Sequence, residues 1–299
     1  IKAASYRTQR RGGKGVATAT KDEDEVRIIL PAKNHDDLWF FTSNGRVFQL
    51  PTYELPETVR TAKWQPIVNF LSLQKDEEIS TILLANKADK KFLFFATRQG
   101  TVKRIARDDI TNIRSSGLIV IKVKEGDKLG WVKPTSGEDM ILLVSQQGQA
   151  IQFKETDARA MGRAAAGVRG IRLKWDDRLV TANVVNEDVS FVMTVAEKWL
   201  GKISEIADYR SQNRGGSGIK VGAITKKTGN IIGAAMLSEE DRKQADIVLI
   251  SRGGQTVRMP LKGIRKTGRV SQGVILTKLK KKDDVLVSMS IVRDEGEEE

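Results

Sequence analysis

The chain has 299 residues, of which 51 are Lys or Arg and 38 are Asp or Glu, and its net charge at pH 7 is +13. It contains one histidine and no cysteine, which excludes a disulfide scaffold, a thiolate metal site and a cysteine nucleophile. The apolar runs have the length of strands, so we expect no membrane span, no signal peptide and a cytoplasmic location. The excess of positive charge favours nucleic acid or another anionic partner.

A basic, glycine-rich loop is the first element that we expect, at residues 9–15 (QRRGGKG). Its residues are Gln9, Arg10, Arg11, Gly12, Gly13, Lys14 and Gly15, and none of them is apolar. Such a loop cannot build a core, whereas glycines let the backbone approach a phosphate that the cations also contact. We therefore predict that this loop binds DNA, and the alternative is a surface loop without a special role. A weaker copy, NRGGSG, follows at residues 213–218.

A tight turn of the form Ser/Thr-x-x-Gly, followed by a short apolar strand, recurs at a period of about 50 residues. Its glycines are Gly45, Gly100, Gly148 and Gly254. The sequence VAEKWLGK (195–202) fits between the last two copies, with Lys198 in the place of the glycine. A tight hairpin favours positive φ at this place, which lysine tolerates poorly, so the geometry of the fourth turn stays open.

Two further patterns recur at the same period. The first is Arg-x-x-x-Gly, which begins at Arg11, Arg163, Arg214 and Arg269 and has imperfect copies at Arg60 and Arg114. The second is an acidic turn before a strand, at Asp24, Glu77, Asp127, Asp177 and Asp283, with Gly229 in the corresponding place of the fifth unit. These two patterns count six units, whereas the hairpin turns count five. We interpret the chain as six units and expect it to begin inside its first repeat.

The texture of each unit is that of β-structure, because short runs of Val, Ile, Leu and Phe are bounded by Gly, Asn, Asp or Pro. One helical turn is expected in SEEDRKQA (238–245). Small sheets cannot bury their faces alone, so neighbouring sheets must stack into a ring. The prediction is an all-β, six-bladed, propeller-like ring of four-stranded repeats, forming a single domain over residues 1–292. An acidic, disordered tail is expected at residues 293–299.

The positive charge is expected to form a belt on this ring, because each Arg-x-x-x-Gly loop recurs at the same place of successive blades. We predict that DNA contacts along this rim come from Arg60, Lys63, Arg114, Arg163, Arg169, Arg172, Lys174, Arg214, Lys220, Arg269 and Lys278. No base-reading element stands out, so the expected recognition runs through the backbone and deformability of duplex DNA, largely independent of sequence.

Four stretches resemble the C-terminal domain family of gyrase A, the DNA-cleaving component of DNA gyrase: SYRTQRRGGKG (5–15), FFTSNGRVFQL (40–50), YELPETVRTA (53–62) and MGRAAAGVRGIRL (161–173). Residues 9–15 match the family's heptapeptide, the GyrA box, and the resemblance covers essentially the whole chain. It implies a β-pinwheel, a propeller relative with another strand order, which wraps DNA so that a holoenzyme of gyrase A and gyrase B introduces negative supercoils. It also implies a monomeric, non-catalytic domain without a cofactor, since the DNA-cleaving tyrosine, ATP and magnesium belong to other parts of that type IIA topoisomerase.

Other functions remain as alternatives. An enzyme is disfavoured, because the single histidine, His35, lies between a charged turn and an apolar strand and is interpreted as a surface residue. A propeller that binds a protein partner is a stronger alternative, and it would depend less on salt than a DNA-binding rim. The C-terminal DNA-binding domain of topoisomerase IV is a further alternative, against which the intact heptapeptide at residues 9–15 speaks.

Overall fold

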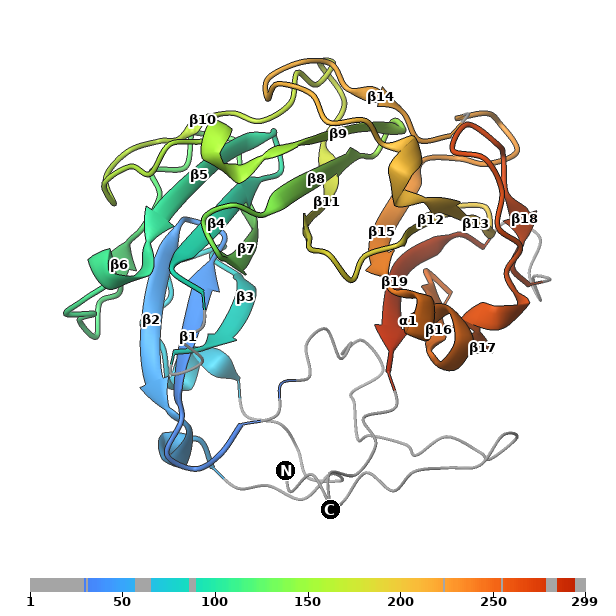
Figure 1. The fold of residues 1–299 in the computed structure, drawn as a ribbon. Helices are drawn as coiled ribbons and strands as arrows, with labels where there is room; N and C mark the ends of the chain where they lie inside the picture. Colours follow the sequence, from blue (N-terminus) through green and yellow to red (C-terminus); the bar gives the residue numbers. More distant parts are fainter. Residues whose placement is uncertain are drawn as a thin grey trace.

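The described residues form five antiparallel β-sheets arranged around a common centre (Figure 1). The computed structural model describes residues 30, 32–56, 66–85, 90–222, 224–253, 255–277 and 284–293. Each sheet is built on one β-hairpin. The hairpins are β1 (Asp37–Thr42) with β2 (Arg46–Pro51), β4 (Phe92–Thr97) with β5 (Thr101–Ala106), β8 (Met140–Ser145) with β9 (Gln149–Lys154), β12 (Phe191–Ala196) with β13 (Leu200–Glu205), and β16 (Asp246–Ser251) with β17 (Thr256–Pro260).

A third strand lies on the inner side of each hairpin, facing the centre of the ring (Figure 1). These inner strands are β3 (Ile79–Leu84), β7 (Leu129–Thr135), β11 (Leu179–Val185), β15 (Ile231–Leu237) and β19 (Leu286–Val292). Each pairs with the first strand of its own hairpin. The last four of them line an open hollow of about 270 Å³.

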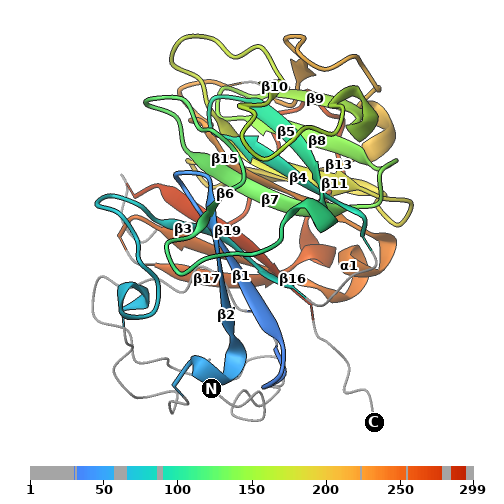
Figure 2. The same cartoon turned by 90° about the vertical axis from the view of Figure 1, so that its left-hand side faces the viewer.

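The outermost strand of four sheets is supplied by the following repeat. These two-residue strands are β6 (Leu118–Ile119), β10 (Val168–Arg169), β14 (Ile219–Lys220) and β18 (Val274–Ile275). They pair with β2, β5, β9 and β13 respectively. After each of the second to fifth hairpins the chain therefore adds a strand to the preceding sheet and returns to its own sheet as the inner strand. Figure 2 shows one such sheet from the side, with β10, β5, β4 and β7 in its order.

The prediction of six blades is wrong. The part of the chain that the structure describes forms five sheets, four with four strands and one, β17-β16-β19, with three. Each sheet contains one hairpin, so the number of hairpin turns in the sequence, five, equals the number of sheets. Between Arg114 and Arg269, the Arg-x-x-x-Gly and acidic patterns lie in segments that cross between neighbouring sheets, so these patterns do not count the sheets.

The hydrophobic core lies between neighbouring sheets. A sheet that has a neighbour on each side buries side chains on both of its faces. In β4, Leu93 and Phe95 pack toward the first sheet, whereas Phe94 and Ala96 pack toward the third. Phe95 meets Phe41 of β1 edge to face, with 5.8 Å between the ring centroids. Successive residues of a strand point to opposite faces, so the continuous apolar runs in the sequence reflect burial on both sides.

Helical structure in the described residues is confined to three-residue 3-10 turns and one six-residue α-helix. The second hairpin strands lead into the 3-10 turns η2 (Thr52–Glu54), η4 (Arg107–Asp109), η5 (Glu155–Asp157), η6 (Ile206–Asp208) and η7 (Leu261–Gly263), and η3 (Ile67–Asn69) precedes β3. The expected helical turn near residue 240 is confirmed as α1 (Glu239–Gln244), with a capping box between Ser238 and Asp241. Among the described residues, no helix has the length and apolar character needed to cross a bilayer.

The fourth hairpin turn departs from the sequence interpretation. Trp199, and not Lys198, holds the place of the glycine, because β13 begins at Leu200, and Trp199 has a φ of 61°. Such a backbone costs a non-glycine residue about 1–2 kcal/mol. The Trp199 side chain is buried, and its Nε1 donates to the backbone oxygen of Asp284 at 3.2 Å. Burial of this large side chain offsets the cost of the turn.

The acidic turns cap the hairpin turns of their own sheets. Asp127 Oδ1 accepts a hydrogen bond from the backbone N of Gln99 at 2.9 Å, and Asp177 Oδ1 accepts one from Gln147 at the same distance. Of the other predicted members, Asp24 and Asp283 lie outside the described residues. The carboxylates of this pattern therefore have a structural role in the described repeats.

Candidate nucleic-acid interface

The four outermost strands share one arrangement of side chains. In each of them the first residue is half-buried and the second is exposed. The exposed residues are Ile119, Arg169, Lys220 and Ile275. Arg169 and Lys220 were predicted as rim residues, whereas the two isoleucines were not, although their equivalence follows from their place after each Arg-x-x-x-Gly motif. The outer edge of the ring thus combines cations with two exposed apolar side chains.

The predicted rim cations fall into three groups. Exposed side chains belong to Arg114, Arg163, Arg169, Arg172, Lys174 and Lys220, and half-buried ones to Arg214 and Arg269. Residues 9–15, Arg60, Lys63 and Lys278 lie outside the described residues. Within the described part of the chain, none of the six exposed cations forms an ion pair with a carboxylate. Their charge is therefore available to an external anion.

Backbone hydrogen bonds join the rim segments of successive repeats. The N–H of Gly215 donates to the oxygen of Gly170 at 2.6 Å, and that of Arg172 donates to Gly216 at 2.8 Å. One repeat earlier, the N–H of Lys122 donates to Ala165 at 3.4 Å. Each Arg-x-x-x-Gly loop therefore lies beside the outermost strand of the preceding repeat, and the cations of neighbouring repeats follow one another along one edge.

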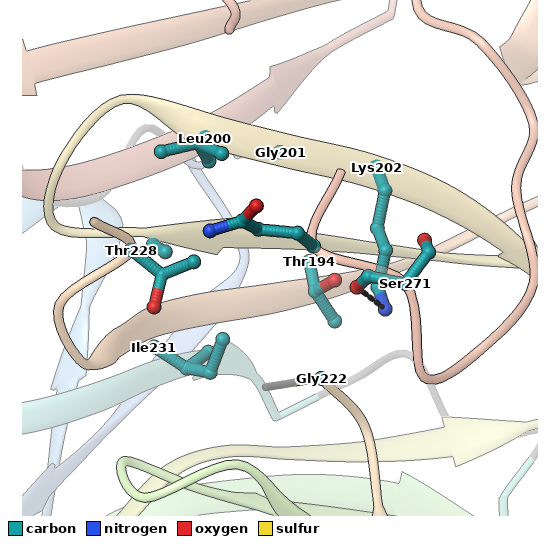
Figure 3. Close-up of a pocket in the computed structure, with 10 residues that line it drawn as sticks. Thr194, Leu200, Gly201, Lys202, Gly222, Thr228, Ile231 and Ser271 are labelled. Carbon is teal, nitrogen blue, oxygen red and sulfur yellow. Dashed lines mark hydrogen bonds between the residues drawn. The ribbon is translucent and has the colours of Figure 1, made fainter. Parts of the chain in front are cut away.

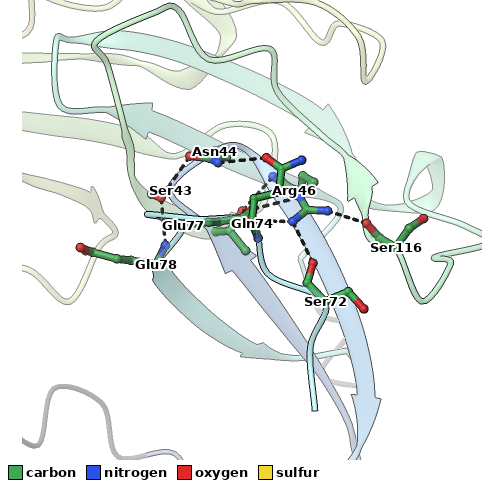
Figure 4. A network of polar contacts seen from close by, with 9 residues as sticks. Ser43, Asn44, Arg46, Ser72, Gln74, Glu77, Glu78 and Ser116 are labelled. Carbon is green, nitrogen blue, oxygen red and sulfur yellow. Dashed lines mark hydrogen bonds and ion pairs between the residues drawn. The ribbon is translucent and has the colours of Figure 1, made fainter. Parts of the chain in front are cut away.

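The side chain of Arg46 joins two rim segments, one at Ser72 and one at Ser116 (Figure 4). Arg46 Nη1 donates to the backbone oxygen of Ser116 at 2.7 Å and Nη2 to that of Ser72 at 3.1 Å. The same guanidinium forms an ion pair with the buried carboxylate of Glu77. Burial alone would raise the pKa of Glu77, but hydrogen bonds from Arg46, the backbone of Gln74 and Thr42 lower it below its ordinary value. Glu77 therefore stays ionised and fixes Arg46.

The two half-buried rim arginines, Arg214 and Arg269, also join neighbouring rim segments. Arg214 Nε donates to the oxygen of Asp157 at 2.8 Å, and its Nη1 donates to the oxygen of Arg169 at 3.1 Å. Arg269 Nη1 donates in the same way to the oxygen of Lys220, one repeat further on. Each arginine thus binds the exposed residue of the preceding outermost strand. Part of the hydrogen-bonding capacity that was predicted for DNA is used within the protein.

Two buried lysines in the hairpin strands β5 and β13 bind the backbone of the rim loops. Lys103 Nζ donates to three backbone oxygens, those of Val120 at 2.7 Å, Arg163 at 2.6 Å and Ala165 at 2.9 Å. Lys202 Nζ donates to the oxygens of Arg269 and Ser271, the latter at 2.7 Å (Figure 3). Neither lysine was predicted as a site residue, because nothing in the sequence marks a strand lysine whose ammonium group meets carbonyl oxygens.

Burial changes the protonation of these lysines. Desolvation lowers the pKa of Lys103 to about 8. Desolvation also lowers the pKa of Lys202 to about 8, helped by the charge of Arg269 and opposed by that of Asp208. At neutral pH both groups are still mostly protonated.

The free energy of unfolding is expected to rise with pH between about 8 and 10.5. Below pH 8 both lysines are charged in either state, but unfolded lysines keep their protons up to the ordinary pKa of 10.5. In this window the unfolded chain binds more protons than the folded one, so stability increases by up to about 3 kcal/mol per lysine. Urea unfolding at pH 8 and 10 measures the rise. Equal rises in the chain and in a Lys103→Met/Lys202→Met variant would contradict the assignment.

The last residue of the Arg-x-x-x-Gly motif must be glycine for the outermost strand to pair with the preceding sheet. Gly218 has a φ of +74°, and a Cβ atom there would lie 2.3 Å from the backbone oxygen of Ala150 in β9. Gly167 has a φ of +91°, and a Cβ atom would lie 2.6 Å from the oxygen of Val102 in β5. Only glycine lets the outermost strand come this close to the neighbouring hairpin.

His35 is exposed in the turn before β1, as predicted for a surface residue. No group of three His, Asp or Glu side chains among the described residues is placed to hold a metal ion.

The fold and its edge define a propeller-type ring with exchanged outer strands and a cationic outer rim. The model of the family described as "DNA gyrase C-terminal domain, beta-propeller" matches residues 1–33, 36–86, 91–136, 139–186, 200–238 and 245–293. The chain therefore belongs to the DNA gyrase C-terminal domain family.

Relatives with known names agree with this assignment. The gyrase A protein of Ureaplasma parvum serovar 3 is 39% identical over 282 residues, which are 94% of this chain and 33% of the relative. The gyrase A protein of Staphylococcus aureus (strain NCTC 8325 / PS 47) is 38% identical over 301 residues, covering 99% of this chain and 33% of the relative. The chain thus spans about a third of the length of these relatives.

Two solved structures are similar to the ring. A DNA gyrase A C-terminal domain has a TM-score of 0.76 and 26% sequence identity, covering 97% of this chain and 94% of that chain. The C-terminal domain of a DNA topoisomerase IV has a TM-score of 0.81 and 24% identity, covering 92% of this chain and 84% of that chain. At this identity the second likeness shows the fold alone.

Proposed function

We propose that this chain binds duplex DNA along the outer edge of the ring and bends it around that edge. The observation that carries the proposal is the row of exposed cations without carboxylate partners on the rim segments of successive repeats, from Arg114 to Lys220 in the described part of the chain. Phosphates neutralised by such cations release counterions, which supplies affinity without reading base sequence.

The proposal requires contacts along an arc rather than at one patch. Bending roughly 40 base pairs through a half circle costs on the order of 10 kcal/mol by an elastic estimate. Each phosphate contact offsets a small part of this cost, so several contacts at fixed positions are needed. The hydrogen bonds that join the rim segments of neighbouring repeats hold the cations at such positions.

In a longer protein of this family the bent segment would serve negative supercoiling. We propose that the chain is the DNA-wrapping, non-catalytic part of a gyrase A protein, which acts with gyrase B in the holoenzyme. The family membership and the relatives named as gyrase A support this role. Residues 9–15 would hold one end of the wrapped segment, because three cations and three glycines suit contact with phosphates.

Removing three rim charges tests the interface. The variant Arg163→Ala/Arg169→Ala/Arg172→Ala is expected to lose affinity for duplex DNA by about 10²-fold at 0.1 M salt, with a salt slope smaller by about 2.7. Titration of labelled duplex DNA at several salt concentrations measures both quantities.

The matched control removes the same charge at the opposite end of the strands. Lys154, Lys243 and Lys262 are exposed at the end of β9, in α1 and in η7. Their replacement by alanine is expected to leave the salt slope within about 0.5 of the parent value. Equal effects of the two triple variants would count against a specific rim. DNA affinity that does not depend on salt would favour a propeller for protein partners instead.

A further inference from the structure

Two lysines with buried ammonium groups lie beneath the predicted DNA-contacting loops. The side chain of Lys103 belongs to β5 and is fully buried, and that of Lys202 belongs to β13 and is 3% exposed. Among the described residues, neither ammonium group forms an ion pair with a carboxylate. A buried charge without a counter-ion is expensive, so its hydrogen bonds must compensate for lost hydration.

Both ammonium groups direct their hydrogen bonds to the backbone of the rim. Lys103 binds the oxygens of Arg163 and Ala165 in one Arg-x-x-x-Gly loop, together with Val120 after the preceding outermost strand. Lys202 binds Arg269 and Ser271 in the loop two repeats later. In each case a rim arginine itself supplies one of the bound carbonyl groups. The position of its backbone is therefore fixed relative to the sheet below.

The fold itself does not require lysine at this place. Lys103 and Lys202 are each the third residue of the second hairpin strand. The same place holds Phe48 in β2 and Ile151 in β9. Phe48 lies under the loop that ends at Gly117, and Ile151 lies near Gly216. An apolar side chain can therefore support a rim loop, so stability alone does not explain the two lysines.

We propose that Lys103 and Lys202 are positioning residues of the DNA-binding rim, which hold the loops of Arg163 and Arg269 in the conformation that bends DNA. This inference rests on the proposed function. A loop that can shift would follow straight DNA, so contacts with phosphates would persist while the bending force would be lost. A loop whose carbonyl groups are held by an ammonium group keeps its arginine in place against the stiffness of the duplex.

The test separates DNA affinity from DNA bending. The variants are Lys103→Met, Lys202→Met and their combination, and the probe is a linear duplex of about 150 base pairs, close to one persistence length. Ligase-mediated circularisation measures bending, and a titration at fixed salt measures affinity. We expect circularisation to fall about tenfold for each substitution and affinity to change less than about threefold, because the phosphate-contacting side chains remain.

A half-buried lysine away from the rim provides the matched control. Lys133 in β7 lines the central hollow, and burial also lowers its pKa. Lys133→Met removes the same charge away from the rim and is expected to leave circularisation unchanged. Equal losses in all three single variants, or unchanged circularisation in the folded Lys103→Met and Lys202→Met variants, would overturn the proposal.

Each remaining outcome of the experiment also supports or overturns one of the two proposals. Where a methionine variant does not fold, Lys103→Gln or Lys202→Gln, which keeps a donor without the charge, replaces it under the same two criteria. A parallel fall of affinity and circularisation would assign the lysines to general stability and overturn their positioning role. Failure of the parent chain to circularise DNA at all would count against the proposed function instead.

Discussion

Replacing Gln9–Gly15 by alanines is expected to abolish negative supercoiling by a reassembled gyrase holoenzyme, while the chain still binds DNA. The segment contains three cations and three glycines. Exposed rim cations such as Arg163 and Arg169 remain, so affinity should fall by no more than the roughly 10²-fold that three phosphate contacts supply. Supercoiling requires DNA to stay on the whole curved path. With one end released, the elastic energy of about 10 kcal/mol straightens the duplex.

The topology of relaxed plasmid after incubation with the holoenzyme and ATP is the measurement. The control is the variant with alanine at Lys154, Lys243 and Lys262. It also loses three positive charges, and it is expected to supercoil normally. Normal supercoiling by the variant of residues 9–15 would refute the assignment. Loss of supercoiling in both variants would show that net charge, and not this loop, is limiting.

The repeating sheets could be predicted from the sequence because each hairpin leaves a local mark. A turn residue with positive φ, such as Gly45 or Gly100, stands between two short apolar runs, and this pattern needs only neighbouring residues. The number of blades could not be predicted in the same way. In the part of the chain from Arg114 to Arg269, the motifs that counted six belong to segments crossing between sheets, and a two-residue strand such as β10 has no periodicity that would show its partner.

The exposure of six predicted rim cations follows from their place in the repeat, and their contact with DNA stays a prediction. Arg163, Arg169 and Lys220 are exposed, because their places in the repeat lie on the outermost segment. The interior of the rim was not predictable. A sequence does not show whether a cation meets solvent or a backbone oxygen, so Lys103 was overlooked and Arg214 was assigned to DNA alone. These contacts depend on loops that lie about 60 and 45 residues away in the chain.

The glycine motif itself has a second role beyond the one inferred from composition. In QRRGGKG the glycines were interpreted as allowing close approach to a phosphate. In the described copies the last glycine, such as Gly167 or Gly218, faces the backbone of the neighbouring hairpin instead. Glycine at this place is therefore needed for the exchange of the outermost strand, and this exchange places the arginine four residues earlier on the rim.

Gly218→Ala is expected to destabilise the chain by about 3–5 kcal/mol, because two costs combine at this residue. A left-handed backbone with a φ of +74° costs alanine about 1–2 kcal/mol. A Cβ atom 2.3 Å from the oxygen of Ala150 must also displace β14 from β9, which breaks the pairing of Ile219 and Lys220. Lys220 and Arg214 would then leave their places on the rim, so DNA bending should be lost together with stability.

The same loop offers two graded controls. Gly216 has ordinary φ, and its nearest neighbour to a Cβ atom would be 3.7 Å away, so Gly216→Ala should change stability by less than about 0.5 kcal/mol. Gly215 has a φ of +82° but space around it, with the oxygen of Arg169 at 3.5 Å, so Gly215→Ala should cost only the backbone term of about 1–2 kcal/mol. Urea unfolding of the three variants measures the series. If Gly218→Ala were no more destabilising than Gly215→Ala, the outermost strand could not be held by close backbone contact. The glycine of the motif would then be needed for binding DNA and not for the fold.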